Sequence, residues 1–204
     1  MRRDQWLAHS RVQIAPTDPN ARLMAGHCLE KLGQFTTAMR TYMAVVDADS
    51  PAVSSDARAS LARLLILAGG AQKGLEVLQP AIKQSPDDPR LLTLQAAAKL
   101  GLKDVAGARA DVDRALKLQP DNEDAVALRA GIYRQHGDLA NATALVGAAV
   151  QKSPSNTGLR EMLASLYASA HEDAKAEEQL QALIKLQPKE TRYRGQRAVF
   201  YTSE

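Results

Sequence analysis

The residues that could carry out chemistry are few and far apart in this sequence. Four histidines are separated by long stretches of chain, and the only cysteine, Cys28, directly follows His27. Neighbouring side chains on a helix point about 100° apart, so these two residues cannot converge on one metal ion. We therefore expect no metal site, and we interpret Cys28 as a small packing residue rather than a nucleophile.

Phosphate chemistry and acid–base catalysis also lack the patterns that they need. No glycine-rich loop ends in Gly-Lys-Ser or Gly-Lys-Thr, and Gly69-Gly70 fits a turn between two helices. The acidic pairs Asp87-Asp88 and Glu177-Glu178 fall on expected turns and helix faces, where carboxylates are solvated. The sequence predicts a protein without catalytic residues and without a cofactor.

The composition is that of a folded protein with little electrostatic bias. Hydrophobic residues make up 45% and charged residues 24%, and the net charge of +3 is too small to indicate a nucleic-acid partner. The most apolar stretch, residues 64–68, is far shorter than the roughly 18 residues of a membrane helix. We expect a cytoplasmic protein without membrane insertion. A periplasmic or envelope-associated location is the alternative if the sequence belongs to a longer chain.

A repeat in the sequence must position any functional surface. Its prolines are spaced by 34 or 35 residues, at Pro16, Pro51, Pro86, Pro120, Pro154 and Pro188. Small residues keep nearly the same period in one series, Gly26, Ala62, Ala96, Ala130 and Ala164, and in another, Ala38, Gly74, Ala108, Ala142 and Ala176. Within each period, apolar residues recur every three or four positions, which predicts two helices of roughly 13–14 residues. Such a pair cannot bury enough apolar surface alone, so we expect successive pairs to stack.

The pattern resembles the tetratricopeptide repeat (TPR). The first full copy carries it as Gly26…Leu29…Leu32-Gly33-Gln34-Phe35…Ala38…Tyr42…Val45…Pro51. The resemblance implies an all-α fold, an α-solenoid of stacked antiparallel helix pairs that form a right-handed superhelix. The expected units are residues 19–54, 55–88, 89–122, 123–156 and 157–190, with a half repeat or cap at 1–18 and another at 191–204.

Two copies depart from the family pattern. The second has Pro80 inside its second helix, which we interpret as a local kink absorbed by packing or as a bend that changes the curvature. The third has Lys99 in place of an aromatic residue and Lys103 in place of the turn glycine. We expect these changes to weaken single copies without altering the fold.

The resemblance also implies a role in protein–protein interaction. The first helix of each unit would line a concave groove for a peptide or protein partner. The predicted groove residues are Leu23, His27, Arg63, Ile66, Thr93, Ala97, Ala127, Arg134, Glu161 and Ser165. Arg63 and Arg134 could pair with a carboxylate of the partner, and Glu161 would add specificity. In the alternative interpretation, the small residues of this face only permit tight curvature.

The kind of partner is less constrained by the sequence. The alanine-rich copies resemble bacterial members of the family, which suggests a role in an envelope, secretion or polysaccharide-export assembly. In the alternative hypothesis, the chain is the partner- or substrate-binding region of a larger enzyme, such as a transferase fused to repeats. The paired lysine and asparagine residues that clamp chaperone tails in this family are missing at Leu23/His27 and Ala59/Arg63. The basic run 189–197 could bind nucleic acid, but we expect it to begin another repeat.

Overall fold

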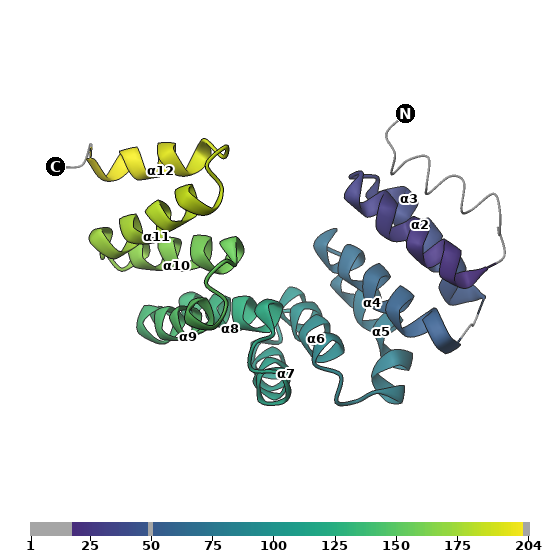
Figure 1. The fold of residues 1–204 in the computed structure, drawn as a ribbon. Helices are drawn as coiled ribbons and strands as arrows, with labels where there is room; N and C mark the ends of the chain where they lie inside the picture. Colours follow the sequence, from purple (N-terminus) through teal and green to yellow (C-terminus); the bar gives the residue numbers. More distant parts are fainter. Residues whose placement is uncertain (1–17, 49–50, 202–204) are drawn as a thin grey trace. The chain divides into compact units, whose positions relative to one another are not determined.

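The computed structural model describes residues 18–48 and 51–201, and within these ranges it contains eleven α-helices and no β-strand. The helices, shown in Figure 1, are α2 Pro19–Lys31, α3 Phe35–Asp47, α4 Pro51–Leu67, α5 Ala71–Gln84, α6 Pro89–Gly101, α7 Val105–Leu118, α8 Glu123–Gln135, α9 Leu139–Lys152, α10 Thr157–Ser169, α11 Asp173–Leu186 and α12 Arg192–Tyr201. The expected half-unit at 1–18 lies outside the described residues except for Asp18.

The helices alternate between a first and a second helix of successive pairs. The even-numbered helices are the first helices, and the odd-numbered ones are the second helices. The described chain falls into two compact units, the first ending at Ala115 and the second beginning at Leu116. In the first unit, consecutive helices pack against each other from α2 through α6. In the second unit, consecutive helices do so from α8 through α12. The predicted all-α class and the stacking of helix pairs are confirmed.

Each core layer is built by three helices. In the first unit, a first helix, its second helix and the next first helix contribute the buried residues Leu23, Tyr42, Val45, Ala57 and Leu61. In the second unit, the corresponding layer of α8, α9 and α10 contains Val126, Ala130, Val146 and Leu163. The last layer holds Ala164, Leu180, Leu183 and Tyr193. A second helix is therefore buried only when a further first helix covers it.

Side-chain caps start most of the first helices. Asp18 and Asp88 each accept a hydrogen bond from the backbone two residues further on, and a proline follows each of them. Asn122 and Asn156 cap α8 and α10 in a similar way. Helix α4 already begins at Pro51 and has 17 residues, so the expected boundary between residues 54 and 55 lies inside it.

The two departures predicted from the sequence are accommodated differently. Pro80 is exposed within α5, which continues without interruption, so the carbonyl group that loses its N–H partner can bond to water. Lys99 of α6 extends its ammonium group to within 2.7 Å of the Asp111 carboxylate on α7, and both side chains are mostly buried. An ion pair thus occupies the place where an aromatic side chain is usual.

A residue in the left-handed backbone region ends the first helix of each complete pair. Gly33, Gly69 and Gly137 have φ angles of 72°, 84° and 74°. Lys103 and His171 adopt the same conformation, with φ angles of 65° and 57°. The turn is kept even where the sequence lacks glycine, although a side chain in this region costs about 1–2 kcal/mol.

We predict that Lys103→Gly and His171→Gly will each raise the free energy of unfolding by about 1 kcal/mol, because glycine adopts this conformation without strain. Gly137→Ala should lower it by a similar amount. Urea titrations followed by circular dichroism would measure all three changes. A loss of stability in Lys103→Gly would show that the lysine side chain stabilises the turn by another route.

Glycine also sets the distance between α2 and α3. A Cβ atom at Gly26 would overlap the ring of Tyr42, which is fully buried and cannot move aside. By contrast, a Cβ atom at Gly131 of α8 would meet no other atom within 4 Å. Both glycines lie within helices, where alanine is intrinsically preferred.

Gly26→Ala should therefore lower the free energy of unfolding by about 1–3 kcal/mol through overpacking. Gly131→Ala serves as the matched control and should raise it by up to about 1 kcal/mol. Thermal and urea unfolding of both variants would test this pair. Equal effects of the two substitutions would contradict the assigned role of Gly26.

Candidate functional site on the first helices

Glu30, near the end of α2, joins three helices of the first unit. One of its carboxylate oxygens accepts a hydrogen bond of 2.7 Å from the Tyr42 hydroxyl on α3, and the other pairs with the Arg63 guanidinium on α4. The Glu30 side chain is 14% exposed, whereas that of Arg63 is 43% exposed. Both oxygens of the acid are thus used internally, while part of the guanidinium faces solvent.

Tyr42 is the buried member of this cluster. Burial raises the pKa of the Tyr42 phenol far above its ordinary value, and the hydrogen bond to the Glu30 carboxylate raises it further. The hydroxyl therefore remains protonated and donates to Glu30. The ring of His27 lies beside the Tyr42 ring, with 5.6 Å between the ring centres. The His27 Nε2 atom is 3.3 Å from the Ser60 hydroxyl on α4.

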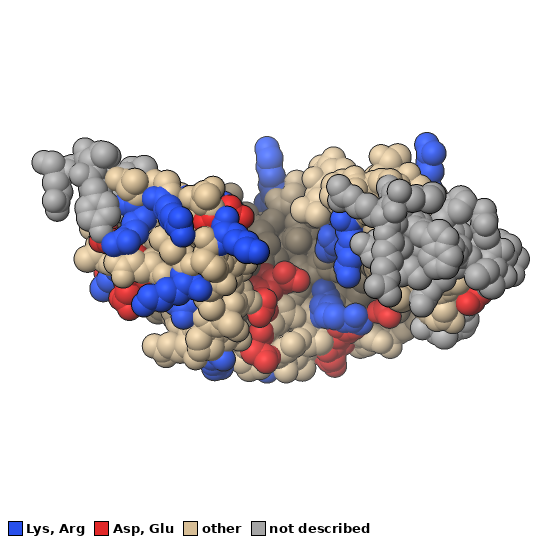
Figure 2. All heavy atoms as spheres, turned by 45° about the horizontal axis from the view of Figure 1, so that its top comes forward, with Lys and Arg blue, Asp and Glu red and all other residues tan. Residues whose placement is uncertain are grey.

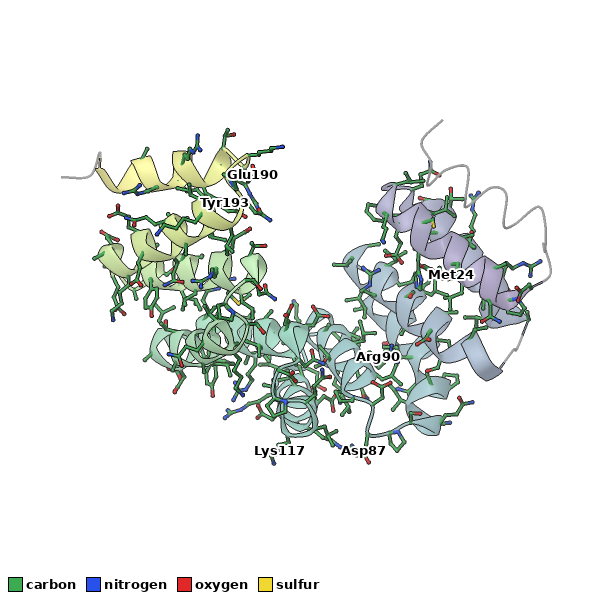
Figure 3. All side chains as sticks on the ribbon, viewed as in Figure 1. Met24, Asp87, Arg90, Lys117, Glu190 and Tyr193 are labelled. Atoms are coloured by element: carbon green, nitrogen blue, oxygen red, sulfur yellow. The ribbon has the colours of Figure 1, made fainter. Side chains whose placement is uncertain are left out.

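A second polar contact links α4 to α6. The Arg90 guanidinium lies 3.2 Å from the Asp56 carboxylate on α4 and 3.1 Å from that of Asp88, the cap of its own helix. Figure 3 shows Arg90 on the side of α6 that faces α4. Arg90 and Asp56 are exposed, so the pairs add little stability, but the charges neutralise one another along the first-helix face.

The other predicted groove residues of the first unit differ in how much surface they offer. Leu23 and Thr93 are buried, and the Thr93 hydroxyl donates a 2.7 Å hydrogen bond to the backbone of Pro89. The predicted residues that keep part of their surface are His27, Arg63, Ile66 and Ala97.

Sequence reasoning missed Leu67, the last residue of α4. Its side chain is 73% exposed, more than the other exposed large hydrophobic residues of the described chain. It follows Arg63 by four positions and therefore lies on the same helix face. In the sequence, Leu67 lies within the most apolar stretch, residues 64–68, so the sequence pattern did not distinguish it from the buried Leu64.

The second unit has its own polar cluster, centred on Glu161 of α10. Its carboxylate accepts hydrogen bonds from Arg192, at 2.6 Å, and from the Tyr193 hydroxyl, both on α12. Tyr193, labelled in Figure 3, is fully buried, and burial raises the pKa of its phenol, as does the hydrogen bond to Glu161. Of the remaining predicted residues, Arg134 and Ser165 are exposed and Ala127 is half-buried.

The basic run at the C-terminal end is engaged in internal contacts. Besides the pair of Arg192 with Glu161, Arg197 lies 2.8 Å from the Glu177 carboxylate, and Arg194 donates to the backbone of Pro188 at 3.2 Å. Figure 2 shows basic and acidic side chains both spread over the face in view, with uncharged surface between them. These arginines do not form an unpaired basic patch for phosphates.

Metal-binding clusters and membrane-spanning helices are both missing from the described part of the chain. In residues 18–48 and 51–201, no group of three or more His, Cys, Asp or Glu side chains is arranged to hold a metal ion. Within the same ranges, no helix has both the length and the apolar character needed to cross a membrane.

Comparison with known proteins identifies the repeat. Family models described as tetratricopeptide repeat match residues 19–51, 59–123, 93–157 and 133–198. The chain belongs to the tetratricopeptide repeat family. No curated protein matches this TPR chain.

Solved TPR structures share its fold at low sequence identity. A thermophilic TPR protein of Thermus thermophilus is 20% identical with a TM-score of 0.78, and the match covers 91% of this chain and 100% of the other. PilF of Pseudomonas aeruginosa is 15% identical with a TM-score of 0.67, covering 89% and 88%. YrrB, a TPR protein described as having an unusual peptide-binding site, is 15% identical with a TM-score of 0.55, covering 94% and 97%.

These similarities establish the TPR fold. Stacked repeats of this kind are typical of proteins that bind other proteins on an extended surface, because successive helices present their side chains side by side. The general role of a protein-interaction scaffold follows from the family.

Because the pKa of Tyr42 is raised in the folded state, we predict that the free energy of unfolding depends on pH. An unfolded tyrosine loses its proton near pH 10, whereas the raised pKa keeps Tyr42 protonated in the folded state. Above pH 10, ionisation of Tyr42 favours the unfolded chain. The contribution of Tyr42 to the free energy of unfolding is therefore complete below pH 10 and declines above it by up to about 1.4 kcal/mol per pH unit. Urea midpoints of the wild type and Tyr42→Phe at pH 8 to 11.5 would measure it. Parallel curves for the two proteins would contradict the prediction.

Proposed function

We propose that this TPR chain is a non-catalytic scaffold whose first helices bind a peptide or a segment of a protein partner. The observation that carries the proposal is the pairing on α4 of a half-exposed, positioned arginine with a strongly exposed leucine. Arg63 is held in place by Glu30, and Leu67 lies one turn further along the same face. A guanidinium of fixed orientation beside an exposed apolar side chain suits a binding surface that combines hydrogen bonding with apolar burial.

The remaining groove residues extend this proposed surface within each unit. In the first unit, His27, Ile66 and Ala97, like Arg63, keep part of their surface. In the second unit, Ala127, Arg134 and Ser165 would play the corresponding part, beside Glu161. Leu23 and Thr93, which are buried, would support the surface rather than touch the partner.

We further propose a setting for this scaffold in a bacterial envelope, secretion or polysaccharide-export assembly. The alanine-rich first helices, with Ala59, Ala97 and Ala127 on the binding side, support it through their resemblance to bacterial repeats. YrrB is described as a TPR protein with a peptide-binding site, and a peptide partner is what we propose for this chain as well.

Site-specific cross-linking tests the proposed surface. A photoreactive amino acid at Leu67 of α4 should cross-link the partner in a lysate of cells that produce this chain. The same group at Met43, which is 49% exposed on the second helix α3, is the matched control and should not. Arg63→Ala should weaken the Leu67 cross-link at least tenfold, equivalent to about 1.4 kcal/mol or more of binding free energy.

Arg109→Ala provides the second control, since Arg109 is exposed on α7 and forms its ion pair within that helix. It should leave the cross-link at Leu67 unchanged. Equal cross-linking from Met43 and Leu67, or a cross-link that survives Arg63→Ala, would refute binding at the first-helix face.

A further inference from the structure

We propose that Glu30 determines which kind of peptide the first unit binds. It neutralises the charge of Arg63, so this face accepts an uncharged peptide segment. Amide oxygens of this segment bond to Arg63, and one of its apolar side chains covers Leu67. This inference rests on the proposed function and specifies its ligand. It replaces the carboxylate that the sequence alone suggested as the group bound by Arg63.

The hydrogen bonds of the pair leave only Arg63 open to a ligand. Glu30 accepts from Tyr42 at one oxygen and from Arg63 at the other, and its side chain is only 14% exposed, so little of it is open to a cation of the partner. Arg63 reaches Glu30 through Nη2. The Arg63 side chain is 43% exposed, so its N–H groups on Nε and Nη1 can donate to a ligand.

The charge of Glu30 disfavours an anionic ligand. A carboxylate bound to the Arg63 guanidinium would also lie near the Glu30 carboxylate, and the repulsion between the two anions offsets part of the attraction by the guanidinium. A carboxylate must also give up far stronger hydration than an amide when it is bound. The amide oxygen keeps the hydrogen bond at a lower desolvation cost and is therefore preferred.

The surroundings of the pair support the same choice. Arg90, the next cation on this face, is shared by Asp56 and Asp88, so it offers no unpaired positive charge either. Lys31 is exposed, but it follows Glu30 directly and lies about 100° around α2 from it. Leu67 supplies the apolar contact, with 73% of its surface open to a partner.

Selection from a random peptide display library tests the inference, with wild-type protein and Glu30→Gln as targets. The glutamine keeps an acceptor for Tyr42 and removes the charge, and thermal unfolding would verify that it folds. Wild type should enrich peptides without Asp or Glu, and their affinity should change less than about twofold between roughly 50 and 300 mM salt. Glu30→Gln should enrich acidic peptides, bind them about tenfold more tightly than wild type does, and lose that gain in high salt.

Glu76→Gln is the matched control, because Glu76 is exposed on the second helix α5 and accepts a hydrogen bond from Gln72 of its own helix. It should select the same peptides as wild type. Acidic peptides selected by the wild type, or an unchanged selection by Glu30→Gln, would overturn the inference.

The same peptides separate this inference from the proposed function. If Arg63→Ala and Leu67→Asp abolish binding of acidic peptides, the first-helix face is the binding site and only the assigned ligand class is wrong. If peptides bind equally to both variants, or if the wild type enriches no peptide, the proposed function fails together with the inference.

Discussion

Burial of each second helix depends on the first helix that follows it. The apolar side of α3, with Tyr42 and Val45, is completed only by α4, and the apolar side of α11 is completed only by α12 through Tyr193. No helix pair in the described chain encloses a core of its own, so stability is shared between neighbours rather than held within a copy. Within each unit, this constraint places the first helices side by side, and these helices provide the surface that we assign to binding.

Much of this arrangement could be predicted from the sequence, because it depends on residue type and spacing alone. The recurrence of Ala38 and Ala142, and of Gly26 and Ala130, marks positions where helices approach closely, and the structure buries them. The turns were less predictable. His171 adopts the glycine conformation because the packed helices on both sides determine the path of the backbone, a tertiary effect that local preference does not reveal.

The candidate site was predictable only in part. Position within the repeat placed Arg63 and Glu161 on the first-helix side. It did not show that both side chains are already paired, Arg63 with Glu30 and Glu161 with Arg192. These partners are 33 and 31 residues apart, and their contact depends on side-chain conformation and on the offset between adjacent helices. The same limitation hid Leu67, whose exposure depends on where α4 ends relative to its neighbours.

The ion pair of Lys99 with Asp111 has a consequence for how the chain assembles. Repeats with similar apolar faces can stack in the wrong order, and such errors trap folding proteins. Lys99 meets Asp111 in its own copy, whereas Tyr133 occupies the corresponding position in the next copy. If α6 packed against the second helix of another copy, Lys99 would be partly buried without its partner, which is far more costly than a lost apolar contact. The pair that departs from the family pattern thus favours the pairing of α6 with α7 over its pairing with another second helix.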